Sequence, residues 1–130
     1  MTREELIQLA IYAKEKAYVP YSQFHVGAAV EMEDGSVYTG ANIENASLTP
    51  TICAERVAIF RAVHDGKRKV KRIVITGDAP HTAPCGVCRQ VLAEFGQDAE
   101  IILADSPTSF EVYSFEEMLP HAFGPKDLVK

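Results

Sequence analysis

Three cysteines and one glutamate carry the clearest chemistry in this chain. Cys53-Ala54-Glu55 places a thiol two residues before a carboxylate, and Pro84-Cys85-Gly86-Val87-Cys88 supplies the other two thiols. Three thiolates can hold Zn²⁺ in a tetrahedral site and leave the fourth position to water, as in catalytic zinc sites. Glu55, close to that position without being a ligand, could then move protons to and from the water.

The same residues also allow other kinds of site. His81 lies four residues before Cys85, so a closed Cys₃His zinc site is an alternative, although it gives Glu55 no task. Cys85 and Cys88 alone have the spacing of a thioredoxin-like redox pair, which leaves Cys53 unexplained. Glu55 could also stand in the first turn of a helix only to complement the helix dipole.

Two arginines stand directly beside the cysteine segments. Three thiolates and Zn²⁺ together carry a negative charge, which would make a bound water a poorer acid. A guanidinium that is hydrogen-bonded to a sulfur would offset this effect. We expect Arg56 to have this role in the second shell of the zinc, with Arg89 as the other candidate. The alternative is that both are solvated surface charges.

The elements that must position these residues follow from hydrophobic periodicity and turn signals. Thr2 and Glu5 have the spacing of a capping box, and Asp34-Gly35 is a hairpin signal. The expected elements are helix 3–17, strands 24–32 and 37–43, helix 54–65, strand 72–76, a helix from 86 to 95, strands 100–104 and 110–113, and a short helix near residue 116.

A hairpin followed by alternating strands and helices predicts an α/β fold. We expect a three-layer α/β/α sandwich around a mixed five-stranded sheet, with residues 1–130 forming a single catalytic domain. Cys53 and Cys85 would then lie at the N-termini of two helices. Free N–H groups and the helix dipole favour the thiolate there, which is the form that binds metal.

Composition excludes several other classes of function. The net charge of −5 argues against sequence-independent nucleic-acid binding, and the basic run from Lys67 to Arg72 is interpreted as a solvated loop. No apolar stretch approaches the roughly 18 residues of a membrane helix. The charged N-terminal segment has no apolar signal-peptide core. We therefore expect a cytoplasmic protein without membrane or nucleic-acid partners.

These motifs resemble those of the small homotetrameric zinc-dependent cytidine deaminases. Besides C-A-E and P-C-x-x-C, the chain has Y-S-x-F-x-V-G-A-A at 21–29 and N-I-E-N-A-S at 42–47, and the resemblance covers nearly its whole length. It implies that Zn²⁺ on Cys53, Cys85 and Cys88 activates water while Glu55 transfers protons. Free cytidine and 2′-deoxycytidine would be hydrolysed to the uracil nucleosides and ammonia, in pyrimidine salvage.

The resemblance also implies a set of substrate contacts. The Ala54 N–H would meet O2 of the base, Phe24 would pack beside the nucleoside, and Ala46 would lie at the substrate. Asn42 and Glu44 would bind the ribose. The residue pattern agrees for this pair, because positions two apart on a strand share a face and an amide with a carboxylate suits sugar hydroxyls.

A composite site between subunits is the last implication of the resemblance. Phe123 would stack on the base in a neighbouring subunit, although it could instead anchor the tail of its own chain. Leu48 departs from the family, which usually has tyrosine there, so a contact toward the 5′ end of the nucleoside is missing. The alternatives are therefore a deaminase of another cytosine-containing compound such as a nucleoside antibiotic, a polynucleotide editor, or a structural zinc module.

Overall fold

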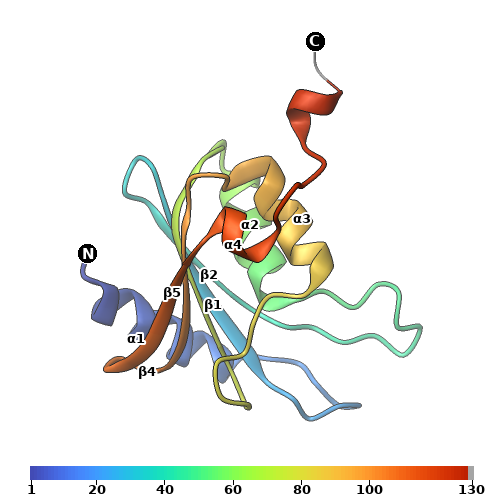
Figure 1. The fold of residues 1–130 in the computed structure, drawn as a ribbon. Helices are drawn as coiled ribbons and strands as arrows, with labels where there is room; N and C mark the ends of the chain where they lie inside the picture. The colour runs from blue at the N-terminus through green and yellow to red at the C-terminus, as the bar shows by residue number, and fades with distance from the viewer. Residues whose placement is uncertain (129–130) are drawn as a thin grey trace.

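A five-stranded sheet forms the middle layer of the computed structural model, which describes residues 1–128 (Figure 1). Its order is β2-β1-β3-β4-β5. The β3–β4 pair is parallel and the other neighbours are antiparallel, so the predicted mixed sheet is confirmed. The strands are β1 (Val26–Met32), β2 (Val37–Ala41), β3 (Val70–Gly77), β4 (Glu100–Ser106) and β5 (Ser109–Ser114).

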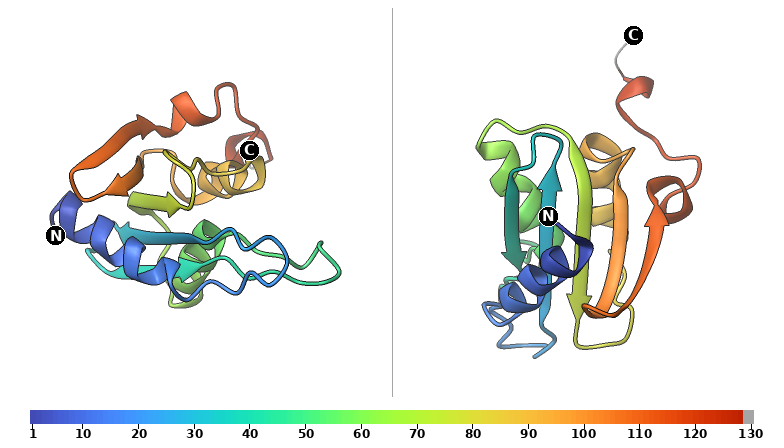
Figure 2. Two further views of the ribbon diagram at one scale, coloured as in Figure 1. Left: turned by 90° about the horizontal axis from the view of Figure 1, so that it is seen from below. Right: turned by 90° about the vertical axis from the view of Figure 1, so that its left-hand side faces the viewer.

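Helices cover both faces of the sheet, which confirms the predicted α/β/α sandwich (Figure 2). One face carries α1 (Arg3–Lys14), and the other carries α2 (Ala54–His64), α3 (Gly86–Phe95) and the short α4 (Phe115–Met118). A 3₁₀ turn, Pro125–Asp127, lies in the tail beyond α4. No helix among residues 1–128 combines the length and the apolar character that crossing a membrane requires.

The chain direction explains why α2 and α3 share a face. Strands β2 and β3 both run antiparallel to β1, so they are parallel to each other, and β4 is parallel to β3. The crossovers through α2 and α3 advance the same way across the sheet, and crossovers between parallel strands are almost always right-handed. Both helices therefore lie on one side and begin at the same edge of the sheet.

Buried aliphatic side chains form a hydrophobic cluster on each side of the sheet. On the α1 side, Leu6, Ile7 and Ala10 pack against Val74 and Ile102. On the other side, strand residues such as Val30, Ile73 and Ile101 pack against residues of α2 and α3, including Ile59 and Leu92. Because the middle of β3 is covered on both faces, Ile73, Val74 and Ile75 are consecutive buried apolar residues rather than an alternating pattern.

Gly40 lets α2 lie unusually close to the sheet. A Cβ atom at this position would be 2.5 Å from the Ala54 carbonyl oxygen and 2.6 Å from the Ala58 backbone nitrogen. Real Cβ atoms do not approach backbone so closely, so any larger residue would push the first turns of α2 away. That turn carries Glu55 and follows Cys53, which makes Gly40 part of what places them.

The predicted elements exist, but several ends were misplaced. Helix 3–17 stops at Lys14, and strands 24–32 and 37–43 shorten to β1 and β2. Asn42 explains both strand ends, because its Oδ1 accepts from the Val26 N–H at 2.9 Å and its Nδ2 donates to the Phe24 carbonyl at 2.9 Å. Backbone groups at the start of β1 are therefore bonded to the Asn42 side chain rather than to a longer β2 strand. The predicted Thr2–Glu5 capping box is confirmed.

Candidate active site

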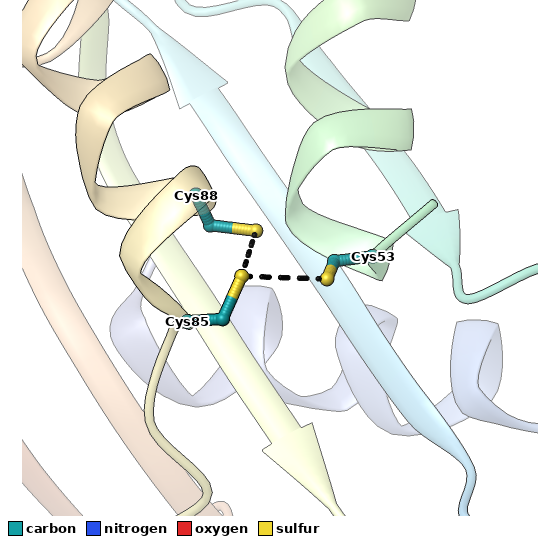
Figure 3. A group of neighbouring side chains, drawn as sticks. All are labelled: Cys53, Cys85 and Cys88. Atoms are coloured by element: carbon teal, nitrogen blue, oxygen red, sulfur yellow. Dashed lines mark hydrogen bonds between the residues drawn. The ribbon is translucent and has the colours of Figure 1, made fainter. Parts of the chain in front are cut away.

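Three cysteines from two helix starts meet at one edge of the sheet (Figure 3). Cys53 is the N-cap of α2, Cys85 is the N-cap of α3, and Cys88 lies in the first turn of α3. Neither N-cap thiol accepts a capping hydrogen bond from the backbone N–H groups of its own helix. The sulfurs are therefore free to turn toward one another.

The sulfur positions fit a zinc ion. Cys53 Sγ and Cys85 Sγ are 3.6 Å apart and Cys85 Sγ and Cys88 Sγ are 3.5 Å apart, with all three within 4.8 Å of one another. Tetrahedral coordination with Zn–S bonds of about 2.3 Å separates sulfurs by about 3.8 Å, close to these distances. The cysteines are not joined by disulfides. The donor set is thus that of a Cys₃ zinc site.

His81 does not complete this set. Its ring lies between Asp105 and Glu111, at 3.0 Å from a carboxylate oxygen of each. Among the described residues, the group with the geometry to hold a metal comprises the three cysteines alone. The closed Cys₃His alternative is therefore not formed, and the fourth position is left without a protein ligand from residues 1–128.

A cationic neighbour stabilises the first thiolate. The Cys88 thiol and the Arg56 guanidinium lower the pKa of Cys53 to about 5, and Arg56 Nη2 donates to Cys53 Sγ at 3.3 Å. The buried Arg56 Nε finds no hydrogen-bond partner within residues 1–128. Arg89 points elsewhere and donates to the carbonyls of Pro84 at 2.8 Å and Met118 at 2.6 Å. The arginine at the sulfurs is thus Arg56.

Glu55 is buried beside the cysteines and is only 3% exposed. Burial raises its pKa to about 7, since desolvation disfavours the charged carboxylate. The negative Cys53 thiolate acts in the same direction, whereas a bound cation would act against it. A carboxyl that changes its protonation state near neutral pH is suited to general acid–base catalysis.

A cavity of about 190 Å³ opens in front of these groups. Six of the residues that the sequence suggested for the site lie in its wall: Phe24, Asn42, Cys53, Ala54, Glu55 and Cys85. The Asn42 side chain is held by its hydrogen bonds to the Val26 N–H and the Phe24 carbonyl, and these bonds also hold the backbone at this edge of the cavity. The cavity wall therefore contains the Phe24 ring, the Asn42 amide and the Glu55 carboxyl next to the cysteines.

Glu44 lies outside this cavity, in a second hollow of about 440 Å³ that it shares with Tyr21, Ser22 and Leu48. Its Oε1 accepts from the N–H groups of Tyr21 at 3.0 Å and Ser22 at 3.1 Å, and its Oε2 accepts from the Ser22 hydroxyl. These bonds, with that of the hydroxyl foremost, lower the pKa of Glu44. The expectation that Asn42 and Glu44 lie on a strand was wrong, because β2 ends at Ala41 and Ile43 between them forms only isolated bridges.

The other suggested residues do not reach the cavity of their own chain. Ala46 and Leu48 belong to the exposed segment 43–52, which projects from the same end of the sheet as segment 18–24 (Figure 2). Phe123 is 58% exposed, and its carbonyl accepts from Gln90 Nε2 at 2.8 Å. The tail therefore rests on α3 while the Phe123 ring is largely open to solvent.

Three wall residues were not among the site residues expected from the sequence. Val26, Thr82 and Ala83 complete the cavity. Val26 looks like an ordinary strand residue. Thr82 and Ala83 precede the Cys85 segment, and this closeness to a ligand was the one clue that could have identified them.

The sequence matches known proteins of one family. Residues 1–104 match the family model described as "Cytidine and deoxycytidylate deaminase zinc-binding region". A cytidine deaminase of Halalkalibacterium halodurans is 48% identical over 98% of each chain, and one of Sporosarcina psychrophila is 45% identical over 98% of this chain and 96% of its own.

Solved structures agree with the sequence comparison. The crystal structure of cytidine deaminase from Burkholderia pseudomallei superposes with a TM-score of 0.90 at 44% identity, covering 95% of this chain and 100% of that one. The structure of cytidine deaminase from Mycobacterium tuberculosis gives a TM-score of 0.81 at 36% identity, covering 95% of this chain and 98% of the other.

Proposed function

Because the chain belongs to the cytidine and deoxycytidylate deaminase family with its zinc-binding region, we propose that it deaminates free cytidine and 2′-deoxycytidine by hydrolysis. The observation that carries the proposal is the buried Glu55 carboxyl beside three sulfurs that fit Zn²⁺. That pair of features supports acid–base chemistry on a water held at a metal.

The chain's own groups account for the proton transfers. When bound by Cys53, Cys85 and Cys88, Zn²⁺ supplies a Lewis acid that lowers the pKa of water. Glu55 accepts one proton from water and delivers it to N3 of the base, then carries the second to the exocyclic amine. The water oxygen forms a bond to C4, the C4–N4 bond breaks, and ammonia leaves. The Ala54 N–H would hold O2 of the base, since Ala54 lines the cavity.

Ribose binding is assigned to Asn42 and Glu44. Both side chains already brace the local backbone. An amide nitrogen has a second proton, and a carboxylate has further lone pairs, so each keeps capacity for a sugar hydroxyl. Because these internal bonds fix their rotamers, the two groups would meet the sugar without losing further freedom. Phe24 would pack against the nucleoside from the cavity wall.

Loss of ultraviolet absorption by cytosine tests the proposal directly. Wild-type protein loaded with zinc should convert cytidine and 2′-deoxycytidine, whereas Glu55→Gln should retain zinc and lose activity by at least about 10²-fold, the scale of general acid–base catalysis. Glu94→Gln, an exposed glutamate on α3, is the matched control and should behave as wild type. A structural zinc module instead predicts that Glu55→Gln changes nothing measurable.

The loop at Leu48 favours one alternative substrate class. Leu48 is 72% exposed and lies in a left-handed conformation beside Glu44. An apolar side chain there offers no hydrogen bond to a 5′-hydroxyl, so a cytosine nucleoside with a changed 5′ group is the second candidate. Relative kcat/KM values for cytidine and 5′-modified analogues separate the two candidates. A polynucleotide substrate is not favoured, since Lys67, Lys69 and Arg72 of the basic run form ion pairs within the chain.

Assembly into a homotetramer with shared active sites belongs to the same proposal. Large apolar side chains remain exposed on the segments near the site, among them Tyr18, Tyr21, Ile43, Leu48 and Phe123. Such side chains are candidates for burial between subunits. Sedimentation equilibrium should give four times the 14.3 kDa chain mass, and an active monomer would contradict shared sites. The three thiols must stay reduced to bind zinc, which supports a cytoplasmic location.

A further inference from the structure

The loop between β3 and α3 supplies part of the cavity wall and ends at a zinc ligand. Thr82 and Ala83 line the cavity, and Cys85 closes the loop. His81 lies directly before the two wall residues with a φ of 50°. This left-handed conformation is uncommon outside glycine, although histidine tolerates it better than most residues. It persists only where surrounding contacts hold it.

His81 forms three polar contacts that fasten the loop to two strands. Its N–H donates to Asp105 Oδ1 at 2.8 Å, its Nε2 is 3.0 Å from Asp105 Oδ2, and its Nδ1 is 3.0 Å from Glu111 Oε1. Asp105 lies at the irregular register of β4 against β5 between Ala104 and Ser106. Bulges of this kind re-aim a side chain, and they recur beside active sites.

Within the described chain, no other residue in the middle of this loop forms a hydrogen bond to a strand of the sheet. At the start of the loop, Asp78 binds His25 and Lys14, and at its end Arg89 Nε donates to the Pro84 carbonyl at 2.8 Å. The Thr82 hydroxyl bonds only within the loop, to the Ala79 carbonyl. Within the described chain, His81 therefore supplies the hydrogen bonds that tie the middle of the loop to β4 and β5.

The contacts of the ring require a particular protonation state. Ionised carboxylates are acceptors only, so both ring nitrogens must carry protons for both contacts to be hydrogen bonds. The neutral ring keeps one of them. The charged and titratable groups around the ring come from four elements: Asp105 of β4, Glu111 and Tyr113 of β5, Arg89 of α3 and Glu117 of α4.

We propose that His81 is a positioning residue of the deaminase: its ring bridges Asp105 and Glu111, holds Thr82 and Ala83 against the substrate cavity, and thereby strengthens nucleoside binding. The inference rests on the proposed function for its substrate. It concerns KM rather than the chemical step, because His81 touches none of the groups that move protons.

Two substitutions separate the ring from the backbone conformation. His81→Gly removes the ring and accepts a positive φ without strain, and His81→Asn also tolerates it but cannot bridge two carboxylates. Both should raise KM for cytidine on the order of fivefold, the factor of a partly exposed ion pair. Zinc content and kcat should stay unchanged.

The split between KM and kcat distinguishes the bridge from a general loss of order. A loop that is only released from the two strands should raise KM and leave kcat unchanged, whereas general disorder of the site should also lower kcat and zinc content. A His81→Asn variant with wild-type KM, or variants whose kcat and zinc content fall together with a raised KM, overturn the inference. His64→Asn, which removes an exposed imidazole on α2, should leave KM unchanged.

A second measurement is independent of turnover. Amide hydrogen exchange in residues 79–83 should be faster in His81→Gly and His81→Asn than in wild type. Equal protection in all three proteins overturns the inference even if activity is absent. A wild-type protein that holds zinc but does not deaminate cytidine refutes the proposed function instead.

Discussion

At the scale of single residues, the charge beside the cysteines decides how readily they take up metal. Arg56 donates to Cys53 Sγ, and with the Cys88 thiol it lowers the pKa of Cys53. Metal binding displaces thiol protons, so a lower thiol pKa favours zinc at a given pH. The guanidinium therefore prepares the site before any ion arrives.

Replacing Arg56 by glutamine should weaken zinc binding by about 10-fold to 100-fold, the range found for groups that support metal ligands. Without the guanidinium the pKa of Cys53 would rise, so at low pH zinc would have to displace a proton from this thiol. The loss of zinc affinity should therefore be larger near pH 6 than near pH 9. Competition with a chelator at both pH values measures this. Arg61→Gln, on the same helix but bonded to Thr39, is the control, and an equal loss in both variants would contradict the role.

Residues in the motifs could be predicted from sequence, because their types and spacing carry the chemistry. The cluster of Cys53, Cys85 and Cys88 and its zinc are confirmed. Val26 and Thr82 could not be found in this way. They reach the cavity only because the end of β1 and the loop after β3 lie side by side, which depends on strand pairing far apart in the chain.

At the scale of elements, the close approach of α2 to the sheet sets the position of Glu55 and Cys53. Gly40→Ala should lower the free energy of unfolding by about 1–3 kcal/mol, the usual cost of overpacking. The added Cβ would meet helix backbone at 2.5 Å, which cannot turn away like a side chain. Urea denaturation measures the change.

Gly86→Ala is the matched control for this overpacking. A Cβ at Gly86 meets nothing within 4 Å, and the residue is the first of α3. Its unfolding free energy should stay the same or rise slightly, because alanine restricts the unfolded chain more than glycine does. Equal destabilisation of both variants would show that loss of glycine itself, and not the contact with α2, is responsible.

Element types could be predicted from periodicity, whereas several ends could not. Alternation and continuous apolar runs identified all five strands. The ends of β1 and β2 depend on Asn42, whose amide binds backbone groups that a longer ladder would have used. Periodicity describes which face is buried, and it contains no information on such a side-chain substitution.

At the scale of the whole molecule, the path of the chain brings the two halves of the site together. Cys53 and Cys85 are separated by 32 residues in sequence, and they meet because α2 and α3 start at the same sheet edge. Sequence alone predicted the α/β/α layers, but the strand order with β1 between β2 and β3 comes from the structure. Local patterns are compatible with several strand orders, since pairing depends on contacts between distant segments.

Asp78 joins three elements near that edge, so acid should loosen the molecule there. Its carboxylate accepts from the His25 N–H at 2.7 Å and contacts His25 Nδ1 at 2.9 Å and Lys14 Nζ at 3.2 Å. The bonds to His25, with help from Lys14, lower the pKa of Asp78 from 3.8 to about 2. A lowered folded-state pKa means stability that is present above pH 3.8 and is lost as the pH falls toward 2. Asp78→Asn should therefore be less stable than wild type at neutral pH, and the difference between their urea midpoints should shrink over that acidic window. If the urea midpoints of the two proteins instead changed by the same amount across this window, the Asp78 charge would not be what links the ends of α1, β1 and β3.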